Sequence, residues 1–291
     1  MPSSRLAIAQ LVLVMLLWGS TFVVTKAGLN GLPPLFFAFA RTTVAALFLL
    51  LFAILSGRWR LPAQVPRSTV LAMAVVGVAV YYSAFNLGLR YTGAAQAALV
   101  QSSLPAVTAA FAMLFLRERP NRRGSVGILL AIAGVIAIFA QSAPGSTASH
   151  PSLGNLITLL AVIAWSVYTV MARRLAAVDP LTITAWVMSA GAAMLGGVAW
   201  LEHRGSDWPH LSLSGWAIVL YLGALPSALC FVLYNAALRR LRAAQVAVFL
   251  NLVPVVGVIA SMAALGEKLS SSALLGGALV LAGVWISTRS D

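Results

Sequence analysis

Two stretches of the chain repeat one pattern: NLGLRYTGAAQAALVQSSLP occupies residues 86–105, and NAALRRLRAAQVAVFLNLVP occupies residues 235–254. Each begins with asparagine, contains Ala-Ala-Gln near its centre and ends with proline, at an offset of 235 − 86 = 149 residues. The same offset aligns the glycines at 127 and 134 with those at 276 and 283. Such matches are informative because Leu, Ala and Val matches arise from composition alone. The sequence therefore predicts a duplication, with one repeat over 1–145 and the other over 146–291.

The composition is typical of a membrane protein. The 291 residues are 61% hydrophobic and 9% charged, with a mean hydropathy of +0.96, well outside the range of soluble domains. The net charge of +13 does not indicate nucleic-acid binding, because the arginines lie in short gaps between apolar segments. The single cysteine, Cys230, is expected to be a small buried apolar residue. No cofactor or metal site is expected.

Ten segments are long and apolar enough to cross a bilayer, which takes about 20 residues for roughly 30 Å of hydrocarbon. We expect spans at residues 6–25, 35–55, 69–89, 94–116, 124–140, 153–171, 181–201, 213–237, 243–265 and 273–288. Proline, glycine and serine clusters mark the gaps as turns. The sequence thus predicts an all-α integral membrane protein of ten transmembrane helices, without a soluble domain.

Positive charges are distributed unequally between alternate ends of these spans. With the N-terminus in the cytoplasm, fourteen arginines fall on the cytoplasmic side, and only Lys26, Arg90, Arg204 and Lys268 fall on the other. The excess of positive charge predicts that both termini are cytoplasmic. Because each half holds five spans, the second half must enter the membrane in the opposite orientation. This is the inverted repeat of secondary transporters, in which the substrate binds near the midplane between the halves.

Several motifs of the chain are shared with one family. They are WGSTFVVTKAG at 18–28, Arg41 early in the second span, the two Asn-to-Pro stretches, and Glu118 and Glu267 followed by glycine-rich spans. By these motifs the chain resembles the EamA family of the drug/metabolite transporter superfamily over essentially its whole length. The resemblance implies two inverted five-helix repeats and export of amino acids or related metabolites through a cytoplasmic (inner) or plasma membrane. Within the family the chain is most similar to the YddG-type aromatic amino acid exporters.

The third span carries the densest set of polar and aromatic residues, including Tyr81, Tyr82 and Asn86. Tyr82 and Asn86 are four residues apart and share a helical face, and Tyr234 occupies the corresponding region of the eighth span. Polar groups facing lipid are unfavourable, so we expect these residues to line a substrate cavity. The alternative is an interfacial aromatic belt with capping of helix ends.

Two tryptophans, Trp18 and Trp165, align at an offset of 165 − 18 = 147 residues, with Ser20 and Tyr168 close by in the sequence. Tryptophan can hold a cation or stack on an aromatic ring, so we expect these four residues to contact substrate. Anchoring at the interface or packing between helices is the alternative.

Gln101 and Asn251 lie in the fourth and ninth spans, shortly before Pro105 and Pro254. Their amides can bind a zwitterionic substrate or bridge neighbouring helices. The prolines interrupt the hydrogen-bond ladder of a helix, and we interpret them as hinges for alternating access. A static kink that improves packing is the alternative.

Charged residues within the expected spans are rare. Glu118 and Glu267 each follow their proline by thirteen residues (118 − 105 and 267 − 254), about 20 Å along a helix. They therefore lie at opposite membrane faces, where they cap a helix, pair with a neighbouring cation or act in gating. Arg41 is the one clearly intramembrane charge. It binds a carboxylate, snorkels to the interface or makes a structural hydrogen bond to the backbone.

The predicted function is export of amino acids, including aromatic and other neutral ones, or of similar small metabolites, by a monomer. The expected partners are this substrate and the lipid bilayer. The sequence has no acidic residue or histidine at mid-depth, which favours facilitated diffusion or exchange over proton coupling. It also lacks HExxH, GxSxG and Walker motifs, so we do not expect an enzyme. The alternatives are an exporter of another metabolite or drug and, in a different class, a membrane enzyme or lipid-handling protein.

Overall fold

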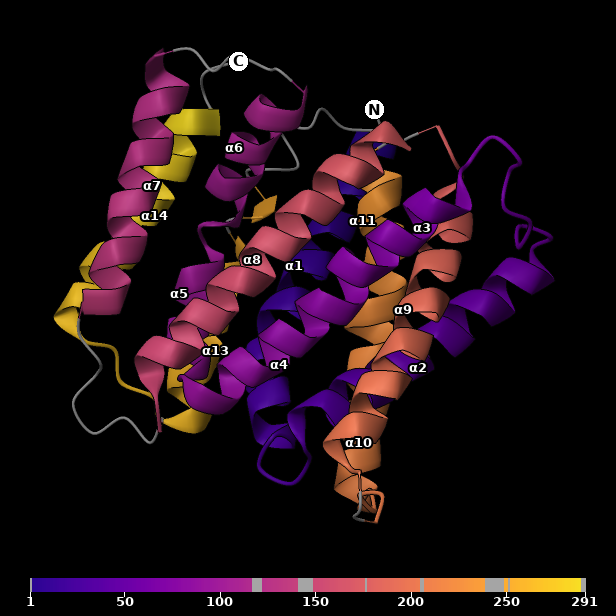
Figure 1. The fold of residues 1–291 in the computed structure, drawn as a ribbon. Helices are drawn as coiled ribbons and strands as arrows, with labels where there is room; N and C mark the ends of the chain where they lie inside the picture. The colour runs from indigo at the N-terminus through magenta and orange to yellow at the C-terminus, as the bar shows by residue number, and fades with distance from the viewer. Residues whose placement is uncertain are drawn as a thin grey trace.

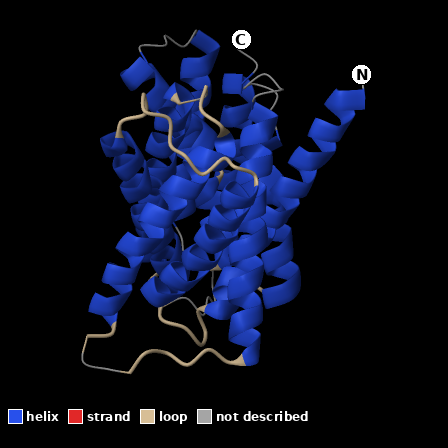
Figure 2. Cartoon of the chain, turned by 90° about the vertical axis from the view of Figure 1, so that its right-hand side faces the viewer, coloured by secondary structure: helices blue, strands red, loops and turns tan. Residues whose placement is uncertain are grey.

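The computed structural model describes residues 2–116, 122–140, 149–175, 177–204, 207–238, 249–250 and 252–288. Every regular element in this part of the chain is a helix (Figures 1 and 2). The elements are α1 (Pro2–Gly28), α2 (Pro34–Leu55), α3 (Arg67–Ala74), η1 (Val75–Val80), α4 (Tyr81–Tyr91), α5 (Ala94–Gln101), α6 (Leu104–Leu116), α7 (Arg122–Ala140), α8 (Pro151–Arg174), α9 (Pro180–Glu202), α10 (Leu213–Leu222), η2 (Gly223–Leu229), α11 (Cys230–Leu238), α13 (Leu252–Leu265) and α14 (Ser271–Thr288). The expected all-α fold is confirmed for the described residues.

Six helical segments are long and apolar enough to cross a membrane. They are Ala9–Gly28, Pro34–Leu55, Arg67–Tyr91, Pro151–Arg174, Pro180–Glu202 and Leu213–Tyr234. These match the first three and the sixth to eighth expected spans, and shorter apolar helices occupy Leu252–Leu265 and Ser271–Ile286. Large apolar side chains are exposed along these helices, with Leu51, Phe52 and Leu55 of α2 all more than half exposed. An apolar surface of this extent needs an apolar surrounding.

The segment 94–116, expected to be one span, is divided between α5 and α6 by a turn at Ser102 and Ser103. Pro105 has no N–H to donate to the carbonyl four residues earlier, and its ring would collide with that carbonyl, so an unbroken helix is unfavourable. The two serine hydroxyls instead donate to carbonyl oxygens three residues earlier, at 2.6 and 2.7 Å. The chain therefore breaks in the middle of the expected span rather than at one of its ends.

Two long helices contain π-helical turns that the sequence analysis did not predict. η1 joins α3 to α4, and η2 joins α10 to α11. Adding the repeat offset of 149 to residues 75–80 gives 224–229, so the two π turns occupy corresponding positions of the duplicated pattern. π-helical turns are rare and frequently lie at functional sites.

Helices α7 and α14 pack tightly against each other at one side of the bundle (Figure 1). A Cβ atom added to Gly134 would lie 2.5 Å from the carbonyl oxygen of Gly276, and one added to Gly283 would meet the carbonyl oxygen of Gly127. Moving seven residues back along α7 corresponds to moving seven forward along α14, so the two helices run antiparallel. Glycine at these positions lets the two backbones touch.

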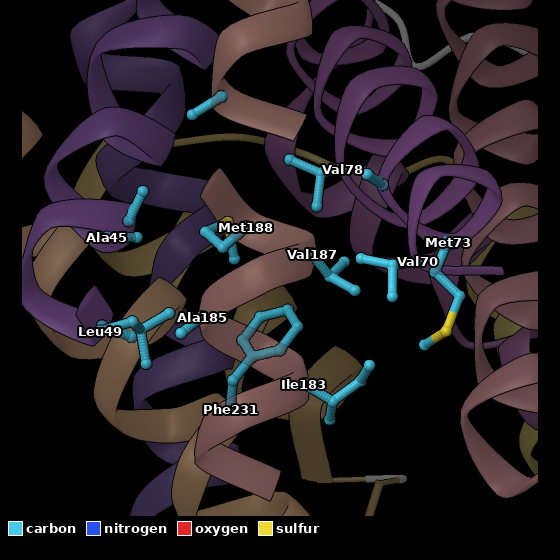
Figure 3. Close-up of a cluster of buried hydrophobic side chains, with 14 of the residues drawn as sticks. Ala45, Leu49, Val70, Met73, Val78, Ile183, Ala185, Val187, Met188 and Phe231 are labelled. Carbon is cyan, nitrogen blue, oxygen red and sulfur yellow. The ribbon is translucent and has the colours of Figure 1, made fainter. Parts of the chain in front are cut away.

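The largest cluster of buried apolar side chains lies on the other side of the bundle, where α2, α3, η1 and α9 meet α11 (Figure 3). Leu49, Met73 and Met188 are fully buried there, and Figure 3 shows them pointing into the space between the helices. The contact between α2 and α9 is reinforced by Glu202, whose carboxylate accepts hydrogen bonds from the first free amides of α2 at 2.8 to 3.2 Å. Packing of α7 against α14 on one side and of α2 against α9 on the other thus stabilises the bundle on both sides of its centre.

Candidate functional site: a central cavity

A cavity lies where the two halves of the chain meet. Its volume is about 70 Å³, measured as the space open to the centre of a water molecule, and a single water needs about 10–15 Å³ by this measure. It is therefore large enough for several waters or for part of a small organic molecule. The first half contributes Trp18, Thr21, Phe22, Arg41, Tyr81, Tyr82, Phe85, Gln101, Ser102, Leu104 and Pro105, and the second contributes Trp165, Pro226, Phe231, Leu250, Val253 and Pro254.

Arg41 brings a positive charge into this cavity from α2. Its side chain is 3% exposed, and its guanidinium donates to the hydroxyl oxygens of Thr25 at 3.3 Å and Ser227 at 3.1 Å. The charged group also lies 4.8 Å from the centre of the Tyr82 ring, a favourable distance for a cation–π interaction. Neither snorkelling nor bonding to the backbone describes this residue, because it is buried and its hydrogen bonds to Thr25 and Ser227 both go to side-chain hydroxyls.

Aromatic rings form most of the remaining wall. The ring of Trp165 lies 4.7 Å from that of Tyr81 and 5.1 Å from that of Phe231, and its centroid is 6.2 Å from that of Trp18. The Trp18 indole donates its N–H to the carbonyl oxygen of Pro226 at 3.0 Å. Rings from α1, α4, α8 and α11 therefore surround one space, and one of them is fixed by a carbonyl of the second π turn.

The structure brings seven of the expected residues together at this cavity: Trp18, Tyr81, Tyr82, Gln101, Pro105, Trp165 and Pro254. Five others, Ser20, Asn86, Tyr168, Tyr234 and Glu267, are described but do not line it. The Ser20 hydroxyl is 2.7 Å from that of Tyr221, and the Asn86 amide donates to the carbonyl oxygen of Pro34 at 3.0 Å. Tyr168 and Tyr234 pack against the two tryptophans on the side away from the cavity.

Those two tyrosines, Tyr168 and Tyr234, stand in the layer next to the cavity. The Tyr168 ring lies 5.1 Å from that of Trp165, and the Tyr234 ring lies 5.0 Å from that of Trp18. They hold the tryptophans in place from outside. Asn251, expected to bind substrate, and Glu118, expected at a membrane face, lie outside the described residues.

Pro226 and Phe231 line the cavity although the sequence analysis did not select them. The sequence contained a signal for the first, because a proline in the middle of an apolar span marks an irregular helix. Phe231 offered no such signal, since phenylalanine is common in any membrane span.

Glu267 lies away from the cavity, beyond the end of α13. Its two carboxylate oxygens accept hydrogen bonds from the backbone amides of Ala94 and Ala95, at 2.8 and 2.7 Å. It therefore caps the N-terminus of α5, where a negative charge is favourable. Nearby, the Lys26 ammonium donates to the carbonyl oxygens of Leu89 and Thr92 at 2.6 Å each, at the end of α4. Ionic side chains thus fix both helix ends that flank the turn at 92–93.

Metal chemistry finds no support in the described residues, which contain no cluster of three His, Cys, Asp or Glu side chains able to hold an ion. The described part of the cavity wall offers one charge, several hydroxyl and amide groups and many rings. This set is suited to binding a small organic molecule.

Comparison with known proteins identifies relatives along the whole chain. The model of the EamA-like transporter family matches twice, at residues 5–140 and 152–289. A probable terminal-alkyne amino-acid exporter of Streptantibioticus cattleyicolor is 30% identical over 287 residues, covering 97% of this chain and 93% of that protein. An uncharacterized transporter of Archaeoglobus fulgidus is 28% identical over 290 residues, covering 96% of each chain. One crystal structure matches with a TM-score of 0.69 at 21% identity, over 98% of this chain and 97% of the other, which shows a shared fold.

Proposed function

The chain belongs to the EamA-like transporter family, and on that premise we propose that it exports amino acids or similar small metabolites by alternating access. It is a multi-pass integral membrane protein, with six strongly apolar helices among those described. The observation that carries the proposal is the central cavity, because both halves supply its wall and a buried arginine lies among its aromatic rings. Substrate sites of secondary transporters lie between such repeats.

Inverted repeats and ten spans form part of this proposal, and the glycine contacts of α7 and α14 support them. Gly127 of the first half corresponds to Gly276 of the second, and Gly134 corresponds to Gly283. The contacts are crossed, since Gly134 approaches Gly276 while Gly283 approaches Gly127. Crossed contacts of this kind are expected where a two-fold axis relates two surfaces. The antiparallel direction of the helices is consistent with an axis lying in the membrane plane.

The substrate class rests on the cavity wall and on one relative. The Streptantibioticus protein is named as a probable exporter of an amino acid, and the wall combines a guanidinium with aromatic rings. Aromatic and other neutral amino acids offer a carboxylate and an apolar side chain to such a wall. By the distribution of arginines, we place both termini in the cytoplasm and the protein in the inner or plasma membrane, acting as a monomeric facilitator or exchanger.

Counterflow in proteoliposomes tests this function. Vesicles preloaded with an unlabelled neutral amino acid should accumulate the labelled form transiently, and an aromatic one should give the strongest signal. Protein-free vesicles and vesicles without internal substrate are the controls. Accumulation should not require a pH gradient, because the cavity wall contains no described acidic group or histidine. If no amino acid shows counterflow, the proposal of amino acid export is rejected, and only the membership of the transporter family remains.

The prolines on the cavity wall give a prediction about rate. If Pro105 and Pro254 act as hinges, replacing both with alanine should slow counterflow roughly tenfold, about 1.4 kcal/mol in the activation barrier, because alanine favours a continuous helix where proline does not. Pro180→Ala, at the start of α9 and outside the cavity wall, provides the control. Unchanged rates in the double variant would leave both residues as static kinks.

The cap on α5 gives a second prediction, because it joins the two halves of the chain. Glu267→Gln keeps one carbonyl acceptor but loses the charge, and should lower the free energy of unfolding by about 1 kcal/mol. We also expect an altered counterflow rate if this contact opens during transport. Glu202→Gln is the matched control, since Glu202 caps α2 with the same pair of bonds. Equal effects of the two variants on rate would argue against gating by Glu267.

A further inference from the structure

The guanidinium of Arg41 has more hydrogen-bond donors than the protein satisfies. Of its five N–H groups, one bonds to Thr25, one bonds to Ser227, and the Nε–H has no partner within the part of the chain that the structure describes. The two partners are neutral hydroxyls, and the Tyr82 ring beside the group is also uncharged. A buried cation with only neutral neighbours is unfavourable, because it has lost its hydration without gaining a counter-ion.

No carboxylate among the described residues serves as that counter-ion. The chain has six acidic side chains, of which Glu118 and Asp291 lie outside the described residues. Two of the others, Glu202 and Glu267, cap α2 and α5, as their hydrogen bonds show. Asp179 caps α9, where it also lies 3.7 Å from Arg58, and Asp207 is exposed in the loop before α10.

A second unsatisfied donor lines the same cavity. The Gln101 amide lies beside the neutral Tyr81 hydroxyl, but its buried nitrogen makes no hydrogen bond of acceptable geometry among the described residues. Both Gln101 and Arg41 lie on the cavity wall. Two buried donors without acceptors indicate that the acceptor is supplied from outside the chain, since buried polar groups are normally paired. Arginine is well suited to bind a carboxylate through two parallel hydrogen bonds.

We propose that a carboxylate is the indispensable feature of the substrate, held by Arg41 and Gln101, and that an α-ammonium group is dispensable. This inference rests on the proposed transport function and narrows its substrate class to small monocarboxylates with an aromatic or branched apolar tail, amino acids being one subset. No described residue of the wall offers a carboxylate to an ammonium group, and the nearby guanidinium repels it. The rings around Trp165 accommodate the apolar tail.

Four ligands with the same phenyl ring separate the two charged groups. L-Phenylalanine carries both groups, 3-phenylpropionate carries only the carboxylate, and phenethylamine and L-phenylalaninamide carry only the ammonium. Binding to the purified full-length protein in detergent can be followed through tryptophan fluorescence, because two tryptophans line the cavity. We expect 3-phenylpropionate to bind at least as tightly as phenylalanine, and the two amines to bind at least about tenfold more weakly.

Variants of Arg41 identify the group responsible. Arg41→Gln should lower the affinity for both carboxylates by about tenfold or more and leave the weak binding of the amines unchanged. All four ligands should then bind with similar affinity. Arg41→Lys keeps the charge and should retain the preference for carboxylates with reduced affinity. Arg67→Gln removes an exposed arginine at the start of α3 and should bind like the wild type. If Arg41→Gln does not fold, the lysine variant and the wild-type ligand series still decide the question.

The results distinguish this inference from the proposed function. Equal binding of amines and carboxylates to the wild type, or no binding of either carboxylate at millimolar concentration, would overturn the carboxylate rule. Counterflow of amino acids in proteoliposomes would nevertheless keep the exporter proposal. Conversely, exchange of labelled 3-phenylpropionate without exchange of any amino acid would support the carboxylate rule and reject amino acids as the transported class.

Discussion

Replacing Gly276 with alanine is expected to lower the free energy of unfolding by about 2 kcal/mol, because the added methyl group would overlap the backbone of α7. A Cβ atom at this position would lie 2.6 Å from the carbonyl oxygen of Gly134 and 2.9 Å from the backbone nitrogen of Ile138. Backbone atoms cannot rotate away as a flexible side chain does, so α7 and α14 must separate. Thermal unfolding of the purified protein in detergent measures the loss.

The control for this prediction is the same substitution in an open place. Around Gly197 of α9 nothing lies within 4 Å of the added Cβ, so Gly197→Ala should instead stabilise the protein by about 0.5–1 kcal/mol through helix propensity. Gly134→Ala should lower the free energy of unfolding by as much as Gly276→Ala. The double variant should lose less stability than the two single losses added together, because both changes force apart the same pair of helices. Strictly additive losses would contradict that shared contact.

The second large effect is expected at Trp18, where alanine should lower the initial rate of counterflow by about tenfold or more. The substitution removes a ring of the cavity wall that lies 5.0 Å from the Tyr234 ring and 5.9 Å from the Phe231 ring. It also removes the N–H that bonds to the carbonyl oxygen of Pro226. Rates normalised to the amount of protein in the vesicles measure the effect.

Two further variants separate the contributions of Trp18. Trp18→Phe keeps an aromatic ring but lacks the indole N–H, so an intermediate rate would assign part of the effect to the bond with Pro226. Trp216→Ala, on the exposed face of α10, removes a tryptophan that is 47% exposed and should leave the rate unchanged. Wild-type rates in Trp18→Ala would exclude this ring from the transport path.

The helical class and the family could be predicted from the sequence because both depend on patterns along the chain. Apolar runs of about 20 residues identify spanning helices whatever their packing, and the matched glycines and Asn-to-Pro stretches identify the duplication. The sequence analysis also selected the aromatic pair Trp18 and Trp165 because its members occupy corresponding positions in the two halves, and the structure places both on the cavity wall.

The position of the cavity along the helix axes could not be predicted. The spacing of residues shows which of them share a face of a helix, but not which part of a neighbouring helix each of them meets. Asn86 shares a face with Tyr82 but lies about 6 Å further along the helix. At that level it meets the start of α2 and bonds to Pro34 instead of lining the cavity. Similarly, the sequence identified Arg41 as an intramembrane charge, but its lack of an acidic partner among the described residues depends on which helices surround it.

The π turns η1 and η2 also have a consequence for how these proteins can vary. A π turn corresponds to one extra residue inserted in a helix, and in an α-helix one residue amounts to a rotation of about 100° and a rise of about 1.5 Å. A π turn absorbs that residue within one wider turn, so loss of a single residue from 75–80 would restore a regular α-helix and leave Tyr81 and Tyr82 close to their present angle around its axis. A one-residue deletion within 75–80 would therefore disturb the side chains that follow it less than the same deletion in α9, which has no π turn and where every following residue of the helix would turn by about 100°.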